Sequence, residues 1–178
     1  LQSFIGGEIK GIKIDQRSRY RSDRAKVQHC GAADFELGDK IDKIWCFGKI
    51  IFFWIGGKYF INRLGMTGYW GLLPNGNNVF SVELVDGRKL YFNDDRHFGI
   101  FERIEGDKMD EKINELGFDL LNVKPVDFNE FYDRMERIPP YKELSEVLMN
   151  QNWLICGVGN YIKSEVCYRA GVDPRSLI

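Results

Sequence analysis

The spacing of apolar residues changes along this chain, and that change limits the folds that it can adopt. Val79–Leu84 alternates between apolar and polar residues, as a half-buried strand does, and Arg88–Phe92 follows it after an Asp-Gly turn, a strong hairpin signal. Ile50–Ile55 is continuously apolar and suits a buried strand, with a Gly-Gly turn leading into Lys58–Arg63. Short strands separated by such turns predict an antiparallel sandwich or barrel over roughly the first hundred residues.

The second part of the chain has helical spacing. Met109–Leu116 is a short helix candidate that ends at a glycine, and apolar residues recur at i, i+3, i+4 and i+7 from Phe128 to Met135. The helical period restarts at Leu144 after a Pro-Pro break, and a last helix closes at Gly171. We therefore predict a multi-domain α+β chain, with an N-terminal antiparallel β-sandwich over residues 1–124 and a partial helical domain over residues 125–178.

Composition and charge exclude few functions. Apolar residues make up 44% and charged residues 29% of the 178 residues, an ordinary globular balance. The net charge of -1 argues weakly against a nucleic-acid partner, although a neutral total can hide a basic face. The longest apolar run, Ile50–Ile55, is too short to cross a membrane, and no secretory signal opens the chain. We expect an intracellular protein, in the cytoplasm and nucleoid or in the nucleus according to its source.

The cysteines lie far apart in the sequence and form no CxxC pair. We expect all of them to be buried, reduced thiols, not disulfides or zinc ligands. They are Cys30, Cys46, Cys156 and Cys167.

A Gly-x-Gly turn joins two of the predicted helices, and Asn160 opens the second of them. Glycine lets the backbone approach a ligand closely, and the free amides of a helix start suit an anion such as phosphate. A helix–turn–helix corner that simply needs glycine would give the same spacing, because a lone Gly-x-Gly is weak evidence. The residues alone leave both interpretations open.

The region from Leu148 to Pro174 resembles the helix–two-turns–helix motif of the formamidopyrimidine-DNA glycosylase/endonuclease VIII family. Members carry L-x-D/N-Q, then G-[VI]-G-N, then a helix with an A/S-E pair. The matching segments here are Leu148-Met149-Asn150-Gln151, Gly157-Val158-Gly159-Asn160 and Ser164-Glu165. The resemblance implies that residues 125–178 are the first part of this DNA-binding domain and that Asn160 contacts a phosphate of the damaged strand.

A second segment, Phe47-Gly48-Lys49-Ile50, is similar to the R-G-K or R-A-K segment that precedes a core strand in this family. The family lysine contacts phosphates around the lesion and assists catalysis, so the resemblance makes Lys49 a candidate catalytic and DNA-binding residue. Without the resemblance, a lysine that enters an apolar strand is normally a solvated edge charge that blocks aggregation.

Two further segments resemble family loops. Leu64–Gly68 (LGMTG) is similar to L-G-M-S-G, and Asp94–Gly99 (DDRHFG) is similar to D-P/I-R-R-F-G. In the family, the Met, the first Arg and the Phe fill the void that an extruded base leaves in the stack. The corresponding candidates for DNA binding are Met66, Arg96 and Phe98.

Physical chemistry supports that role, because an extruded base costs a few kcal/mol of stacking. An apolar wedge recovers part of this cost, and an arginine can hydrogen-bond the widowed base. The alternative makes Met66 and Phe98 core residues, which is the commoner fate of such side chains. His97 stands where the family usually has a second Arg, a departure that bears on phosphate contact or lesion preference.

The resemblance extends to Leu1–Ile9 and Leu116–Leu120, so it spans most of the chain in family order. The GNYIKSE sequence favours the Nei-like or plant and fungal branch, whereas the void-filling residues look like the formamidopyrimidine type. The family resemblance implies that the protein is a monomer that binds double-stranded DNA containing an oxidised base or an abasic site and does not associate with membranes. Formamidopyrimidines and oxidised pyrimidines are the expected substrates, with 8-oxoguanine a further candidate.

The resemblance also implies a DNA glycosylase with AP lyase activity by beta/delta-elimination. The family nucleophile is an N-terminal proline that forms a Schiff base with C1′ of the sugar, and a glutamate beside it supplies acid/base catalysis. The sequence begins at Leu1 and contains neither group at its start. We expect a chain truncated at both ends, without the first helix of its β domain, and inactive as it stands. We expect no cofactor or metal in these residues. The resemblance implies a further C-terminal finger outside this sequence, and both a zinc and a zincless form of that finger stay open.

Two other classes of function stay open. The first is a catalytically silent relative that binds damaged DNA, and the second is a β-sandwich binding module with no DNA role. Salt-dependent binding to duplexes with an abasic-site analogue separates the second from the others.

Overall fold

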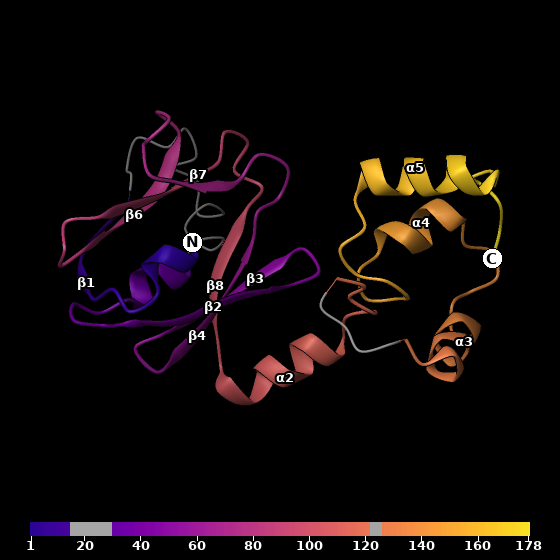
Figure 1. Ribbon diagram of the computed structural model, residues 1–178, viewed down its shortest axis with the longest axis horizontal. Helices are drawn as coiled ribbons and strands as arrows, with labels where there is room; N and C mark the ends of the chain where they lie inside the picture. Colours follow the sequence, from indigo (N-terminus) through magenta and orange to yellow (C-terminus); the bar gives the residue numbers. More distant parts are fainter. Residues whose placement is uncertain (15–29, 122–125) are drawn as a thin grey trace. The chain divides into compact units, whose positions relative to one another are not determined.

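A computed structural model describes residues 1–14, 30–121 and 126–178, which form two compact units (Figure 1). The first unit consists of Leu1–Cys46 with Ile50–Met109, and the second of Phe47–Lys49 with Asp110–Ile178. The predicted domain boundary between residues 124 and 125 lies outside the described residues.

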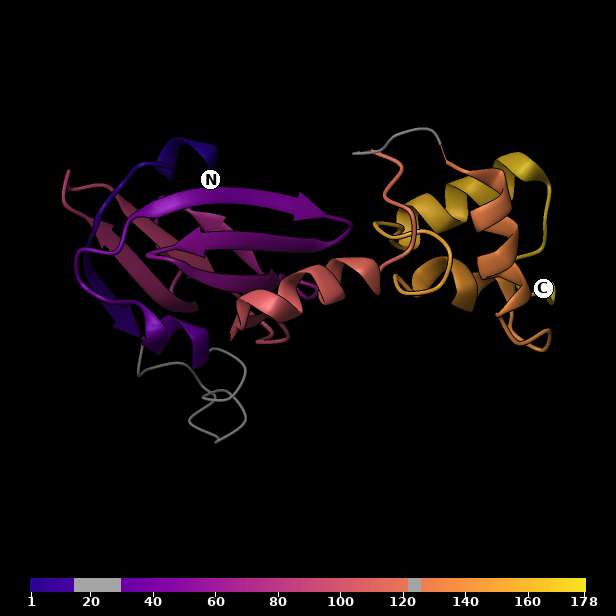
Figure 2. The ribbon, with the colours of Figure 1, turned by 90° about the horizontal axis from the view of Figure 1, so that it is seen from below.

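The first unit is built on two antiparallel sheets of four strands, which can be followed in Figures 1 and 2. One sheet has the order β1-β6-β7-β5, made of Ile9–Ile14, Asn78–Leu84, Lys89–Asn93 and Tyr69–Gly71. The other has the order β2-β3-β4-β8, made of Ile41–Phe47, Ile50–Ile55, Lys58–Arg63 and Ile100–Ile104. Two short 3-10 helices also occur, η1 (Gln2–Phe4) and η2 (Cys30–Asp34). Buried residues of both sheets form one core cluster, so the predicted antiparallel β-sandwich is confirmed.

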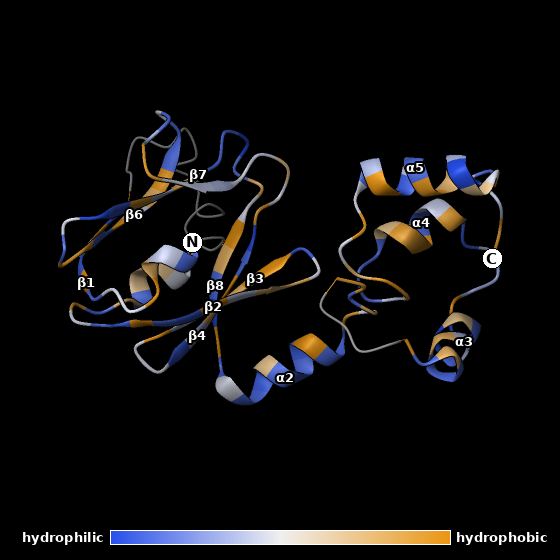
Figure 3. Ribbon diagram, in the orientation of Figure 1, coloured by the Kyte–Doolittle hydropathy of each residue, from blue (hydrophilic) through white to orange (hydrophobic). Residues whose placement is uncertain are grey.

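The predicted hairpins are present because their turn residues suit the required backbone. Gly87 has a φ of 86° in the β6–β7 turn, and Gly56 and Gly57 have φ of 55° and 77° in the β3–β4 turn. The alternation of β6 is also confirmed, since Phe80, Val82 and Leu84 are buried. Strand β3 is apolar along its length (Figure 3).

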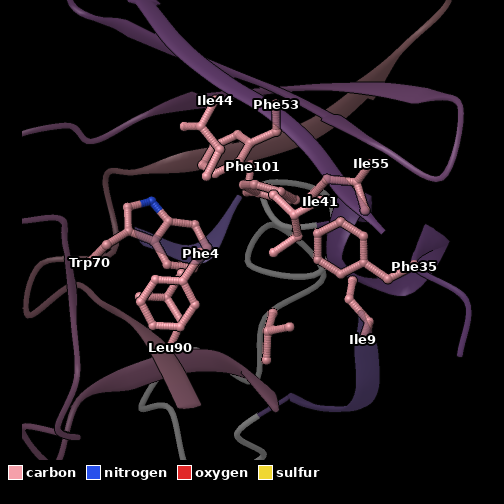
Figure 4. A pocket seen from close by; sticks show the side chains of 11 residues that line it. Phe4, Ile9, Phe35, Ile41, Ile44, Phe53, Ile55, Trp70, Leu90 and Phe101 are labelled. Carbon is pink, nitrogen blue, oxygen red and sulfur yellow. The ribbon is translucent and has the colours of Figure 1, made fainter. Parts of the chain in front are cut away.

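Aromatic rings occupy the centre of the sandwich. Phe101 is fully buried, and its ring centroid lies between 5.1 and 6.0 Å from those of five others: Phe35, Phe53, Phe60, Trp70 and Phe80. The packing leaves a cavity of about 10 Å³ with apolar walls (Figure 4). Such a space is scarcely large enough for one water molecule, so it is a packing defect of the core and not a ligand site.

The second unit carries the helices, and α2 (Gly106–Asn114) leads into it from the first. It contains α3 (Phe128–Glu136), α4 (Leu144–Met149) and α5 (Asn160–Ala170). The Asp127 side chain caps α3 by accepting a hydrogen bond from the Asn129 N–H. The predicted end of α5 at Gly171 is confirmed, with a φ of 65° in the left-handed region. Val147 and its neighbours Ile138 and Leu154 form a small core.

The expectation of buried cysteines is wrong for Cys46, which is exposed near the end of the edge strand β2. Cys156 and Cys167 are buried, and the side chain of Cys30 lies outside what the structure describes. Within the described ranges, no helix has both the length and the apolar character needed to cross a bilayer.

The aromatic core generates a stability prediction. Phe101→Ala should lower the free energy of unfolding by about 3–5 kcal/mol, because it removes a ring with five aromatic neighbours and leaves a void. Val85→Ala, at a side chain that is 59% exposed, should change it by less than about 0.5 kcal/mol. Urea denaturation followed by tryptophan fluorescence measures both, and an equal loss for the two variants would refute the assignment of Phe101 to the core.

Candidate nucleic-acid interface

The turn that carries Lys49 is fixed by a buried carboxylate. Gly48, with a φ of 55°, donates its backbone N–H to Asp119 Oδ2 at 2.8 Å. Asp119 is only 4% exposed, and its Oδ1 accepts the Leu121 N–H at 3.0 Å. A buried carboxylate needs such donors, and a tight turn offers N–H groups that no strand takes up. The hydrogen bond from Gly48 to Asp119 therefore fixes the backbone of the turn immediately before Lys49.

Gln151 connects this turn to the Gly-x-Gly segment. Its Oε1 accepts the Lys49 N–H at 2.7 Å and the Gly157 N–H at 3.2 Å. Gly157 has a φ of 88°, a backbone conformation that favours glycine. One side-chain oxygen thus holds two turns that lie more than a hundred residues apart in the sequence.

The Lys49 side chain completes this connection. Lys49 is exposed as a residue, yet its Nζ donates to the carbonyl oxygen of Val158 at 2.7 Å. That bond holds the Lys49 ammonium group at Val158, two residues before Asn160 in the sequence. An ammonium group has three protons, so the others can donate to a ligand.

Asn160 lies at the first position of α5 and is exposed. The N-cap Gly159 is extended, and the first backbone bond of the helix runs from Lys163 N–H to Gly159 O at 2.9 Å. The N–H groups of the first turn have no carbonyl partner inside a helix, and the helix dipole makes this end positive. Lys163 adds a second cation, with its Nζ 3.3 Å from Asn160 Oδ1. The structure therefore brings Lys49 and Asn160 together in a setting that favours an anion.

Cys156 packs beneath the same turn without taking part in its chemistry. A Cβ placed on Gly48 would lie 2.7 Å from Gln151 Oε1 and 2.9 Å from Cys156 Cβ, so this position excludes a larger residue. Burial, helped by the charge of Asp119, raises the pKa of the Cys156 thiol to about 11. The thiol is therefore protonated at neutral pH and is not a nucleophile.

The other candidate residues lie in the first unit, on the loops Leu64–Gly68 and Asp94–Gly99. Met66 is 72% exposed and Phe98 is 55% exposed, so the alternative that they are core residues is wrong. Arg96 Nη1 lies 3.7 Å from Met66 Sδ, which brings the two side chains together. Gly65, with a φ of 67°, lets the two loops touch, because a Cβ there would lie 2.8 Å from the carbonyl carbon of Phe98.

Sequence reasoning did not assign a role to Asp119 or Gln151. Both lie inside segments that resemble the family. That position is the feature of the sequence that could have singled them out. Their partners are 71 and 102 residues away, a separation that no local pattern reveals. In the part of the chain that the structure describes, no group of three His, Cys, Asp or Glu side chains could hold a metal ion.

Comparisons with known proteins agree on one family. The family model described as formamidopyrimidine-DNA glycosylase N-terminal domain matches residues 1–101. The formamidopyrimidine-DNA glycosylase of Solibacter usitatus is 33% identical over 142 residues, which cover 79% of this chain and 51% of the relative. The Arabidopsis thaliana enzyme of the same name is 30% identical over 132 residues, covering 68% and 32%. The chain spans about half, or less, of the length of these curated relatives.

Solved structures show the same fold. The MutM (Fpg) protein of Thermus thermophilus superposes with a TM-score of 0.74 at 26% identity, covering 99% of this chain and 62% of that one. The Fpg of Lactococcus lactis, in a complex with FAPY-dG-containing DNA, has a TM-score of 0.79 at 21% identity, covering 99% and 66%. The second likeness concerns the fold alone.

The contacts of Gly48 lead to a prediction with a matched control. Gly48 and Gly57 both have positive φ in hairpin turns, but a Cβ on Gly57 would meet no atom within 4 Å. Gly57→Ala should therefore cost only the backbone strain, about 1–2 kcal/mol, whereas Gly48→Ala should cost more because it also displaces Gln151 and Cys156. Thermal unfolding of the two variants measures the difference. Equal losses would contradict the close packing of Gly48.

Proposed function

Because this chain belongs to the formamidopyrimidine-DNA glycosylase family, we propose that it binds damaged double-stranded DNA and serves in base-excision repair. The observation that carries the proposal is the bond from Lys49 Nζ to Val158 O, beside Asn160 at the start of α5. Two segments far apart in the sequence are joined there to present a cation, an amide side chain and free backbone N–H groups together.

A DNA phosphate is the ligand that this arrangement suits. Phosphate oxygens accept from ammonium groups, side-chain amides and helix N-termini, and such contacts position a protein on a duplex. Glycines at 157 and 159 leave room for a backbone as bulky as DNA to approach. The Lactococcus lactis Fpg has been solved with FAPY-dG-containing DNA and with abasic-site DNA, which supports damaged DNA as the partner.

Met66, Arg96 and Phe98 are proposed to occupy the space of an extruded base. Two large apolar side chains more than half exposed are costly to solvate, and a gap in a base stack would remove them from water. Arg96, beside Met66, is then placed to hydrogen-bond the base left without a partner. Formamidopyrimidines and oxidised pyrimidines are the proposed substrates, with 8-oxoguanine a further candidate.

The binding proposal is tested by salt titrations with a duplex containing a tetrahydrofuran abasic-site analogue. Lys49→Ala should weaken binding and reduce the slope of log K against log salt by about one, because one phosphate contact with a cation is lost. Asn160→Ala should weaken binding roughly 3–10-fold with an unchanged slope, because the lost contact is neutral. Fluorescence anisotropy of labelled duplex gives both quantities.

Lys108→Ala provides the control, since Lys108 lies on α2 and pairs with Glu105 at 2.8 Å. It should leave the affinity and the slope close to those of the unmodified chain. Binding that does not depend on salt, or an equal effect of all three substitutions, would contradict a phosphate site at Lys49 and Asn160.

We propose that the chemical step, glycosylase with AP lyase activity, uses the N-terminal proline and glutamate that the family resemblance implies. A polypeptide of these 178 residues begins Leu1-Gln2 and offers neither group at its start. It should bind an abasic-site duplex without forming a complex that borohydride traps, while a purified formamidopyrimidine-DNA glycosylase traps in the same buffer. Trapping in comparable yield would reveal another nucleophile and contradict this assignment.

A further inference from the structure

Asp94 is the first residue of the loop that carries Arg96 and Phe98, and its side chain is fully buried. Its Oδ1 accepts the Thr67 hydroxyl at 2.6 Å, and its Oδ2 accepts the Gly99 N–H at 2.7 Å. Thr67 follows Met66, and Gly99 follows Phe98. One carboxylate thus holds the residue next to each of the two apolar side chains.

Thr67 extends this connection to the third residue. Its Oγ1 donates to Asp94 and also accepts the Arg96 N–H at 3.0 Å, while the same N–H lies 3.3 Å from Asp94 Oδ1. Asp94 and Thr67 therefore bond the backbone of Arg96 directly and connect the residues that follow Met66 and Phe98.

We propose that Asp94 and Thr67 are positioning residues that keep Met66, Arg96 and Phe98 assembled before DNA binds. The proposal rests on the proposed function, because it concerns how the void is filled. Asp94 is inaccessible to solvent, so it acts through the loops and not by touching DNA. Side chains that are ordered in advance lose less conformational freedom on entering the base stack, so insertion should be faster and more complete.

The chemistry of the carboxylate matters to this role. An ionised carboxylate only accepts, and both oxygens are used, one for each loop. An amide has only one oxygen acceptor, so Asp94→Asn can keep only one of the two accepting positions. If its Nδ2 faces Thr67, the bond to the hydroxyl reverses direction and the Arg96 N–H, 3.3 Å away, faces a second donor. Thr67→Val keeps the shape of the side chain but breaks both of its hydrogen bonds, whereas Thr67→Ser keeps the hydroxyl.

Asp95 is a matched control from the next position. Its Oδ1 accepts from Asn75 Nδ2 at 2.9 Å and from Asn77 Nδ2 at 3.1 Å, and these residues belong to a different loop. Asp95→Asn makes the same change of charge one residue away without touching the bonds to Thr67 or Gly99.

The test uses the full 178-residue chain and a tetrahydrofuran duplex with 2-aminopurine beside the abasic analogue, whose fluorescence rises when its stacking is disturbed. Asp94→Asn and Thr67→Val should slow or reduce that rise on the order of tenfold, as expected for a lost hydrogen bond to a charged group. Binding to an undamaged duplex should be unchanged. Thr67→Ser and Asp95→Asn should behave like the unmodified chain.

Circular dichroism identifies any variant that fails to fold, and the Thr67→Val and Thr67→Ser pair decides the matter if Asp94→Asn is such a variant. A wild-type rise in fluorescence for folded Asp94→Asn and Thr67→Val would overturn the positioning role. Absence of any rise for the unmodified chain would instead overturn the proposed void filling on which the role rests.

Discussion

Hydrogen bonding of backbone N–H groups in tight turns is the constraint on which the candidate interface depends. A turn has no ladder partner, and a buried N–H without an acceptor is costly. This chain meets the requirement with buried carboxylates, Asp119 for Gly48 and Asp94 for Gly99. Both are almost inaccessible to solvent, so each is dedicated to a loop and unavailable to a ligand.

The residues proposed to contact DNA are of the opposite kind. Lys49, Met66, Phe98 and Asn160 are exposed. The first three also lie within one residue of a backbone N–H that an acceptor side chain holds, or of a glycine in close contact. Within each unit, an exposed side chain beside a fixed backbone group can bind a partner with little further loss of conformational freedom. The cost of exposing Met66 and Phe98 is then offset only when a partner covers them.

Local patterns were sufficient to predict much of the fold and part of the interface. The β6–β7 and β3–β4 hairpins follow from alternation and glycine turns, and the end of α5 follows from Gly171. The expectation for Cys46 is wrong because residue type does not show which side chains of a strand face the core; Ile41 and Ile44 of the same strand are buried. Asp119 and Gln151 were missed because their partners are 71 and 102 residues distant, and only the folded chain brings them together.

His97 bears on how the proposed interface treats phosphates. It stands where the resemblance leads one to expect a second arginine, and it is 6% exposed with a φ of 55°. A side chain buried to this extent is not available for contact with a phosphate in solvent. Within the described residues of the second unit, the proposed function assigns phosphate contacts to Lys49 and to Asn160, beside which Lys163 adds a positive charge. The net charge of -1 over these 178 residues gives little long-range attraction for a duplex, so the proposed binding would depend on short-range contacts such as these.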